Sequence, residues 1–210
     1  MAEPHAHDHR HPHEGDLEDT APTHHQLMTE AVAGLLVDKG ILGADELRAT
    51  LEAIDQKGPA DGAKLVARAW VDPAFRERVL ADVGAAAGEL GIDAGGILIR
   101  AVANTAGLHN LVVCTLCSCY PRLLIGLPPD WYKARAYRSR AVREPRAVLR
   151  EFGLELPADT VVRVHDSTAD LRYLVLPERP AGTDGWDEAR LAGLVTRDCM
   201  IGTAVPRVPA

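Results

Sequence analysis

Hydrophobic positions recur at helical spacing in the first part of the chain. Thr23 precedes Gln26 by three residues, which is the pattern of a capping box that opens a helix, and Gly40 is the expected end of that helix. The hydrophobic residues between them share one face: Leu27, Ala31, Val32, Leu35 and Leu36. We therefore predict an amphipathic helix over residues 23–39.

Three more helices are predicted before residue 90. The second runs from Ala44 to Lys57 and ends at Gly58, and the third covers residues 61–70. Asp72 and Pro73 are a typical N-cap and first residue of a fourth helix. The side chains expected to point inward are Leu47, Leu51 and Ile54 in the second helix, and Phe75, Val79, Leu80 and Val83 in the fourth. Residues 23–90 are thus predicted to form a helical N-terminal part.

Strand patterns occur in the second half of the chain. Residues 161–165 and 171–176 alternate or run hydrophobic on either side of a turn-rich link, which predicts a hairpin or two adjacent strands. Residues 111–113 form a short β-branched run, and residues 186–199 return to helical spacing. Helices followed by strands indicate an α+β fold without regular βαβ alternation.

The composition of the 210 residues fits one globular domain with an arm. Hydrophobic residues make up 47% but aromatic residues 4%, so we expect a core of Leu, Val, Ile and Ala. No run approaches the ~20 consecutive hydrophobic residues of a membrane span, and the first residues do not resemble a secretory signal. Four cysteines are too few for a disulfide framework, so a cytoplasmic protein is expected.

The net charge of −7 is concentrated at the N-terminus. The first 25 residues hold six acidic side chains and one basic one, which leaves the rest of the chain nearly neutral. Residues 1–22 are predicted to be a disordered arm with five alternating histidines: His5, His7, His9, His11 and His13. Such imidazoles can buffer cobalt or nickel, or simply belong to a solvated tail.

A basic stretch suggests nucleic-acid binding as an alternative. It contains one lysine and six arginines: Lys133, Arg135, Arg138, Arg140, Arg143, Arg146 and Arg150. A chain that is nearly neutral beyond its arm lacks the excess positive charge with which such proteins neutralise phosphates, and few aromatic residues are interleaved. We therefore predict no nucleic-acid partner.

Three of the four cysteines lie within six residues and mark the main candidate site. The sequence there is Val113-Cys114-Thr115-Leu116-Cys117-Ser118-Cys119-Tyr120. A zinc site with Cys199 as the fourth ligand is one interpretation, although structural zinc sites usually pair two distant CxxC units. A redox disulfide between Cys114 and Cys117 is a second, but it leaves Cys119 unexplained. The third is one metal ion held by all three sulfurs.

The spacing favours the third interpretation. Three sulfurs from one short loop meet at one point only if the backbone wraps around that point, which brings the amide nitrogens of Ser118 and Cys119 close as well. Sulfur and nitrogen ligands with one open position suit a trivalent transition metal rather than magnesium or calcium. An open position allows Lewis-acid catalysis.

The segment from Cys114 to Pro121 closely resembles the metal-binding motif of nitrile hydratase α subunits, and Thr115 looks like their cobalt type. The resemblance covers about residues 25–205. It includes the segments 63–73, 126–132, 137–146, 179–186 and 194–198. It implies a layered α-β-β-α metal-binding domain of the nitrile hydratase type over residues 91–210.

The resemblance also implies the chemistry of the site. Cys114, Cys117 and Cys119 would supply three sulfurs to a cobalt(III) ion, in preference to iron, and the deprotonated amides of Ser118 and Cys119 would supply two nitrogens. In the family, the residue matching Cys117 is oxidised to a sulfinate and that matching Cys119 to a sulfenate. Ser118 and Cys119 are the expected catalytic residues.

Hydration of a nitrile to its amide is the activity that the resemblance implies. The nitrile binds at or near the metal, and a sulfenate oxygen on Cys119 or an activated water attacks its carbon. In the family, arginines of a partner β subunit pair with the oxidised sulfurs. This chain is therefore expected to hold the metal and half of the pocket, in a hetero-oligomer with a β subunit or with a third subunit as well.

One segment departs from the two-subunit pattern. Residues 92–100 lack a glutamine and several acidic residues that usually precede the metal strand, and they look more like three-subunit relatives. Those relatives include nitrile hydratases acting on heteroaromatic or nucleoside nitriles such as toyocamycin, and thiocyanate hydrolase, which forms carbonyl sulfide and ammonia. Thiocyanate hydrolysis is the alternative function, and a metal-carrying subunit without activity of its own is a third.

Six other residues have weaker signals. Asp166 and Ser167 match a family Asp-Ser pair near the metal loop and would support the metal ligands, or they form a simple turn at the end of a strand. Trp131 is expected either in the pocket or in a core or interface. Structural roles are predicted for Cys199, His109 and His165.

Overall fold

The computed structural model describes residues 23–209, so the predicted His-rich arm over residues 1–22 lies outside the described residues. The described part of the chain divides after Thr50 into two compact units, and each is described by itself. The division predicted at residue 90 stays a prediction. None of the described helices is long and hydrophobic enough to cross a lipid bilayer.

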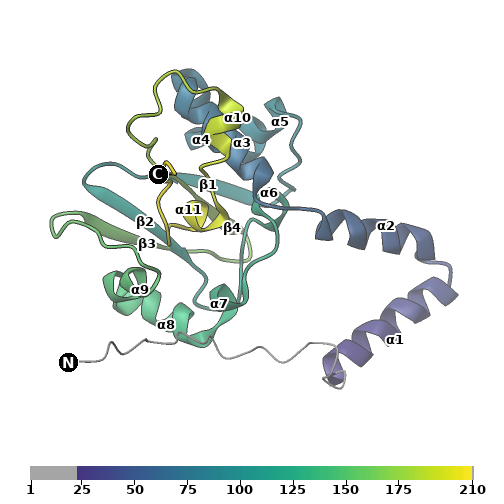
Figure 1. Cartoon of the computed structure of the whole chain (residues 1–210). Coiled ribbons are helices and arrows are strands. Elements are labelled where there is room, and N and C mark those ends of the chain that lie inside the picture. Colours follow the sequence, from purple (N-terminus) through teal and green to yellow (C-terminus); the bar gives the residue numbers. More distant parts are fainter. Residues whose placement is uncertain (1–22, 210) are drawn as a thin grey trace, which may run out of the picture. The chain divides into compact units, whose positions relative to one another are not determined.

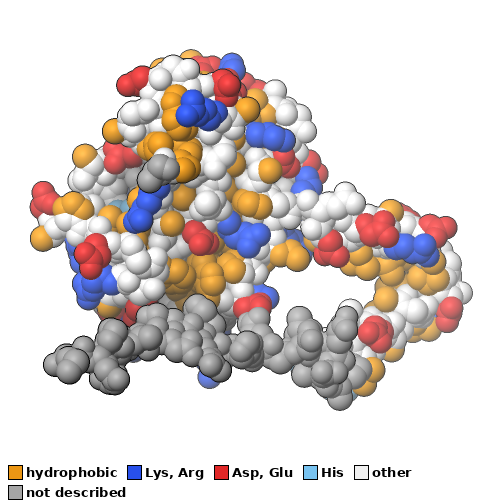
Figure 2. Space-filling view, viewed as in Figure 1, with side chains coloured by type: hydrophobic (Ala, Val, Ile, Leu, Met, Phe, Trp, Pro, Cys, Tyr) orange, Lys and Arg blue, Asp and Glu red, His pale blue; other side chains and the backbone are white. Residues whose placement is uncertain are grey.

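The first unit contains α1 (His24–Asp38) and most of α2 (Ala44–Asp55). Thr23 and Gln26 form the predicted capping box, and Gly40 follows the helix in the left-handed conformation, with φ +66°. Hydrophobic side chains stand at the surface along both helices (Figure 2). Leu51 of α2 is 54% exposed, so the prediction that it points inward is wrong. Two successive helices provide no further layer against which to bury such a face.

Two of the helices near the start of the second unit begin at aspartate caps. Asp72 accepts a hydrogen bond from the backbone of Phe75 (2.9 Å) and precedes α4 (Pro73–Ala81), as predicted; α3 covers Ala60–Val71. Asp82 caps a further helix, α5 (Val83–Glu89), in the same way. The predicted hydrophobic stripe is therefore shared between two helices, since the chain turns at Asp82. Its members Phe75, Val79 and Val83 are buried.

Four strands form two parallel pairs. β1 (Leu98–Ala103) pairs with β4 (Leu171–Leu176), and β2 (Leu108–Val113) pairs with β3 (Val161–Asp166). The two strands predicted over residues 161–176 therefore neither form a hairpin nor pair as adjacent strands, so both alternatives are wrong about the pairing. Both strands exist, but each pairs with a strand from much earlier in the chain, which a local pattern does not reveal. β1 was not predicted at all.

The second unit is layered as α-β-β-α, in agreement with the predicted fold class (Figure 1). On one side, α4 and α5 pack on β1, with α3 and α10 (Glu188–Ala192) beside them. On the other side, α8 (Arg135–Arg143) packs on β2 and α9 (Pro145–Glu151) on β3. The remaining short helices are α6 (Arg122–Ile125), α7 (Asp130–Lys133) and α11 (Arg197–Ile201). The helical spacing of residues 186–199 corresponds to α10 and α11.

Candidate metal centre

Strand β2 leads directly into the cysteine loop. Val113 is its last residue, pairs with Asp166 of β3, and is followed by Cys114. Two buried tyrosines hold the two ends of the segment. The hydroxyl of Tyr137 donates to the carbonyl of Val112 (2.6 Å), and that of Tyr132 donates to the carbonyl of Cys119 (2.9 Å). Helices α7 and α8 thereby fix the loop between them.

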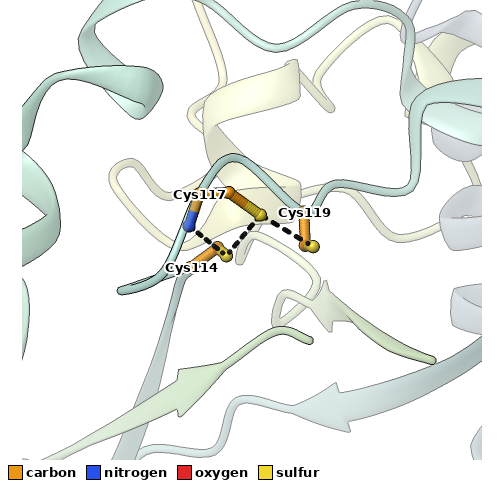
Figure 3. A group of neighbouring side chains, drawn as sticks. All are labelled: Cys114, Cys117 and Cys119. Carbon is orange, nitrogen blue, oxygen red and sulfur yellow. Dashed lines mark hydrogen bonds between the residues drawn. The ribbon is translucent and has the colours of Figure 1, made fainter. Parts of the chain in front are cut away.

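Three thiols converge inside this loop (Figure 3). The Sγ atom of Cys117 lies 3.5 Å from that of Cys114 and 3.2 Å from that of Cys119, and the three sulfurs lie within 4.8 Å of one another. A disulfide bond measures about 2.05 Å, so the cysteines are free. Cys114 and Cys119 are buried, whereas Cys117 is exposed.

The local electrostatics favour a bound cation. Burial, followed by the neighbouring thiols of Cys117 and Cys114, raises the pKa of Cys119 to about 12. The pKa of Cys117 is lowered, chiefly by the hydrogen bond with Cys119 and also by the Cys114 thiol and the backbone amide of Ser118. Three adjacent thiolates repel one another unless a cation lies between them. Sulfur donors of this kind suit a thiophilic transition metal.

Buried hydrogen-bond donors without a partner next to the loop also support a metal centre with negatively charged sulfurs. Arg172 of β4 lines the same cavity as Cys119, and its positive charge favours the Cys119 thiolate. Its Nε and one Nη atom are buried without a hydrogen-bond partner among the described residues, and so is the hydroxyl of Tyr120. Buried polar groups are normally paired, because leaving one unpaired costs stability. A guanidinium in this position fits a group of sulfurs that becomes negatively charged when it binds metal.

Asp166 supports the start of the loop. Its carboxylate accepts hydrogen bonds from the backbone nitrogen of Thr115 (2.8 Å) and from the Thr115 hydroxyl (2.5 Å). The backbone of Ser167 donates to the carbonyl of Val113 (2.7 Å) and so continues the pairing of β2 with β3. Both residues therefore bond to the start of the loop, while a role of this pair beside a bound metal stays a prediction.

A cavity of about 740 Å³ opens beside the loop. Ser118 and Cys119 line it, together with residues 94–97, a part of the segment that departs from the two-subunit pattern. Gly95 has φ +81°, and a Cβ there would lie 2.7 Å from a methyl carbon of Leu123 across the cavity wall. This glycine therefore lets the two walls approach each other.

The other predicted residues have structural surroundings. Cys199 is buried in α11, outside the group of three sulfurs, so it does not complete a zinc site with them. Trp131 does not line the cavity but packs edge-on against Phe152. His109 is buried and bonded to the carbonyl of Gly202 (2.7 Å), while His165 is bonded to the side chain of Asn110 (2.8 Å).

The basic stretch is used largely within the protein. Arg140 pairs with Glu144 and Glu151, and Arg146 donates to backbone carbonyls of residues 156–160. Arg138 donates to the carbonyl of Thr115 (3.1 Å), within the cysteine loop. Three of the six arginines in the stretch therefore have partners within the protein, and these contacts explain their presence without a bound phosphate.

Two arginines of the cavity were missed in the sequence. Arg172 interrupts the hydrophobic run of residues 171–176, and a lone charge in a buried strand is a signal of function. Arg122 follows the cysteine motif by three residues. It lies in a proline-rich segment without a helix or strand pattern, so the sequence did not predict that it lines the cavity. Tyr132 and Tyr137 lie in segments that resemble the family, but the sequence alone does not link them to the loop.

A family model described as nitrile hydratase, alpha chain, matches residues 23–204. The chain belongs to this family. It is 50% identical over 185 residues to the low-molecular weight cobalt-containing nitrile hydratase subunit alpha of Rhodococcus rhodochrous, which covers 86% of this chain and 88% of the relative. The resemblance found in the sequence is thereby confirmed.

Two further relatives differ from the first in their reaction or their metal, according to their names. The thiocyanate hydrolase subunit gamma of Thiobacillus thioparus is 42% identical over 194 residues, covering 87% of this chain and 80% of the relative. The structure of a double mutant of the Fe-type nitrile hydratase from Comamonas testosteroni Ni1 superimposes with a TM-score of 0.82 at 40% identity. That match covers 91% of this chain and 97% of the other. Cobalt-type, iron-type and thiocyanate-hydrolysing proteins thus share this fold.

Proposed function

We propose that this nitrile hydratase α-type chain hydrates a nitrile to the corresponding amide at a non-corrin cobalt(III) centre. The observation that carries the proposal is the convergence of Cys114, Cys117 and Cys119 within 4.8 Å of one another. The cobalt-containing relative at 50% identity favours cobalt, and the Fe-type neighbour makes iron the other candidate.

The proposed ligands all come from the cysteine loop. Cys114, Cys117 and Cys119 hold the ion through sulfur, and the backbone nitrogens of Ser118 and Cys119 complete the set. Cys117 is a sulfinate and Cys119 a sulfenate in the active protein, two steps of the ordinary oxidation ladder of cysteine. A trivalent ion held there supplies the Lewis acidity that makes a nitrile carbon electrophilic.

Residues of the chain then direct the addition of water. In one route, the oxygen on Cys119 would accept a proton from a water whose oxygen adds to the nitrile carbon, and that proton would pass to the nitrile nitrogen. In the other, the Cys119 oxygen itself would bond to the nitrile carbon; a water would then attack the sulfur, break its bond to that oxygen and restore the sulfenate, while its two protons go to the nitrogen of the amide. Ser118, which lines the cavity, is placed to contact the substrate. Arg172 donates to the negatively charged sulfur groups. Asp166 keeps the loop in place through Thr115.

A second subunit is part of the proposal. The family comprises subunits of hetero-oligomers, and the chain exposes hydrophobic side chains that such a partner would cover. Leu116, at the outer side of the cysteine loop, is 87% exposed, and Leu35 of α1 is 53% exposed. We therefore expect a β subunit, with or without a third subunit, to complete the pocket. The four free thiols fit a reducing compartment such as the cytoplasm.

Thiocyanate hydrolysis is the second candidate. It is favoured by the 42% identity to the gamma subunit of thiocyanate hydrolase over most of both chains. Both reactions begin with attack on the carbon of a C≡N group, so the same loop serves either substrate.

The proposal is tested on the chain expressed with its partner subunits and cobalt. Metal content, intact mass and products are measured, with a panel of nitriles that includes toyocamycin, and with thiocyanate. We expect cobalt, a mass increase from cysteine oxygenation, and an amide product. Carbonyl sulfide in place of an amide would establish the second candidate. A protein that holds cobalt but forms neither product would show a metal-carrying subunit and refute both.

A further inference from the structure

A buried asparagine joins the two strand pairs of the second unit. Asn110 lies in β2 and is 1% exposed. Its amide nitrogen donates to the carbonyl of Ala103 in β1 (2.8 Å) and to the side-chain oxygen of Asn104 (2.9 Å), which directly follows β1. Its amide oxygen is bonded to Nε2 of His165 in β3 (2.8 Å). One side chain therefore connects three strands.

Backbone hydrogen bonds do not connect the two pairs in this way. Strand β1 pairs with β4, and β2 pairs with β3. Among the described residues, backbone hydrogen bonds between the two pairs are confined to the links that join consecutive strands, such as the bridge of Thr105 with Leu108. Side chains must therefore fix how one pair lies against the other.

A second contact between the pairs depends on the same asparagine. The ring of His165 packs against that of Tyr173 in β4, and their centroids lie 4.9 Å apart. Tyr173 directly follows Arg172 in the chain. Because the bond to Asn110 orients the His165 ring, removing that bond loosens the contact with Tyr173 as well.

Asn104 and the end of α11 complete this network. The side-chain oxygen of Asn104 also accepts from the backbone nitrogen of Asn110 (2.8 Å), and its amide nitrogen lies 3.4 Å from Nδ1 of His109. A Cβ at Gly202, which follows α11, would lie 2.0 Å from the carbonyl oxygen of Asn110, so α11 leaves β2 no room to shift. A buried polar network whose members are all bonded favours one arrangement of the core over its alternatives.

The arrangement of the strand pairs determines the geometry of the metal centre. The cysteine loop follows β2, whereas Arg172 lies in β4. Both line the cavity, and the charge of Arg172 favours the thiolate of Cys119. The interaction of two charges weakens as the distance between them grows. A shift of one pair against the other would therefore weaken the support of the sulfurs without changing any metal ligand.

We propose that Asn110 is a positioning residue that holds Arg172 against the cysteine loop by fixing one strand pair against the other. Asn110 itself lies outside both the cavity and the group of three sulfurs. The inference rests on the proposed function, because a metal centre with negatively charged sulfurs is what gives Arg172 its task. It extends the machinery of that centre to a network in the protein interior.

The test is a comparison of single and double variants by metal affinity. The metal-free complex is titrated with cobalt(II) and followed through thiolate-to-cobalt absorption, so the result does not depend on turnover. Asn110→Leu removes the hydrogen bonds at a similar side-chain volume, Arg172→Gln removes the charge, and a double variant combines the two. Val148→Ala, buried in α9 and outside the cavity, is the matched control for a general loss of core stability.

We expect Asn110→Leu to weaken cobalt(II) binding about tenfold, the lower end of the usual effect of residues that orient metal ligands. The double variant should bind cobalt(II) no more weakly than Arg172→Gln by itself, because a residue that acts through another has no effect once the other is gone. Val148→Ala should lower the melting temperature but leave the cobalt(II) affinity within about twofold of the wild type, since distant changes act independently.

Asn104 provides a second pair of variants, which answers the question even if Asn110→Leu does not fold. Asn104→Leu removes both bonds that the side-chain oxygen accepts and should repeat the effect of Asn110→Leu. Asn104→Asp keeps an acceptor for both bonds, with His109 beside it to carry a compensating proton, and should recover most of the affinity. A general loss of packing predicts the opposite order, because a buried carboxylate is costlier than a buried leucine.

The outcomes separate the inference from the function on which it rests. Equal weakening by Asn110→Leu with and without Arg172, unchanged affinity in Asn110→Leu and Asn104→Leu, or equal weakening in Val148→Ala overturns the inference and leaves the proposed function standing. A cobalt-loaded wild-type complex that forms no product from any nitrile or from thiocyanate overturns the proposed function instead. The cobalt(II) titrations still test the role of Asn110 in that case.

Discussion

Support of the metal loop by Asp166 gives the most specific prediction about the site. The Asp166 carboxylate accepts two hydrogen bonds from Thr115, the residue that directly follows Cys114. Asp166→Asn keeps the size of the side chain, removes its charge and leaves one acceptor oxygen. The sulfurs themselves are untouched by this change. The prediction therefore concerns how well the loop is held before metal binds.

The expected magnitude follows from the two bonds. Each contributes about 1 kcal/mol, below the usual value for a charged acceptor because both residues are exposed. Losing one bond and weakening the other should reduce the free energy that holds the loop in its metal-binding conformation by about 1–2 kcal/mol. Since about 1.4 kcal/mol corresponds to tenfold in affinity, we expect roughly 5- to 30-fold weaker metal binding. This agrees with the usual effect of mutating residues that orient metal ligands.

The assay is titration of the metal-free protein with cobalt(II), followed through thiolate-to-cobalt absorption. Thr115→Val removes the hydroxyl bond alone, and we expect about half the free-energy loss of Asp166→Asn. The double variant should lose less than the sum of the two, because both changes remove the same bond. Asp170→Asn, an exposed aspartate of the same link, is the matched control. Unchanged cobalt affinity in Asp166→Asn, or equal weakening in Asp170→Asn, would refute the reasoning.

Three other predictions concern the thiols, the buried arginine and the pH dependence of stability. Cys117→Ala should abolish cobalt retention after dialysis, whereas Cys199→Ala should keep the cobalt content of the wild type, as elemental analysis would show. Arg172→Gln should weaken cobalt(II) binding, because the charge that favours the Cys119 thiolate is gone, without destabilising the metal-free protein in thermal denaturation. The free energy of unfolding should fall as the pH drops below about 6.5, because burial lowers the pKa of His109 and the unfolded chain binds the proton first. Urea denaturation of His109→Gln should show a flatter profile below that pH.

Local sequence patterns predicted the helices well and the strand pairing poorly. The capping box at Thr23 and the cap at Asp72 depend on side chains within three residues of the helix start, so the sequence contains the whole interaction. The pairing of residues 161–166 with residues 108–113 depends on contacts between residues more than fifty positions apart in the chain. A turn-rich link permits a hairpin. The parallel pairs that form instead depend on packing between segments far apart in the chain, which a short stretch of sequence does not show.

The candidate site was predictable to the extent that it lies on one loop. Cys114, Cys117 and Cys119 meet as the spacing implied, because a single bend of the backbone brings them together. Arg172 comes from β4, more than fifty residues along the chain, and its place depends on the pairing of β1 with β4. The wrong hairpin prediction and the missed arginine therefore have the same cause.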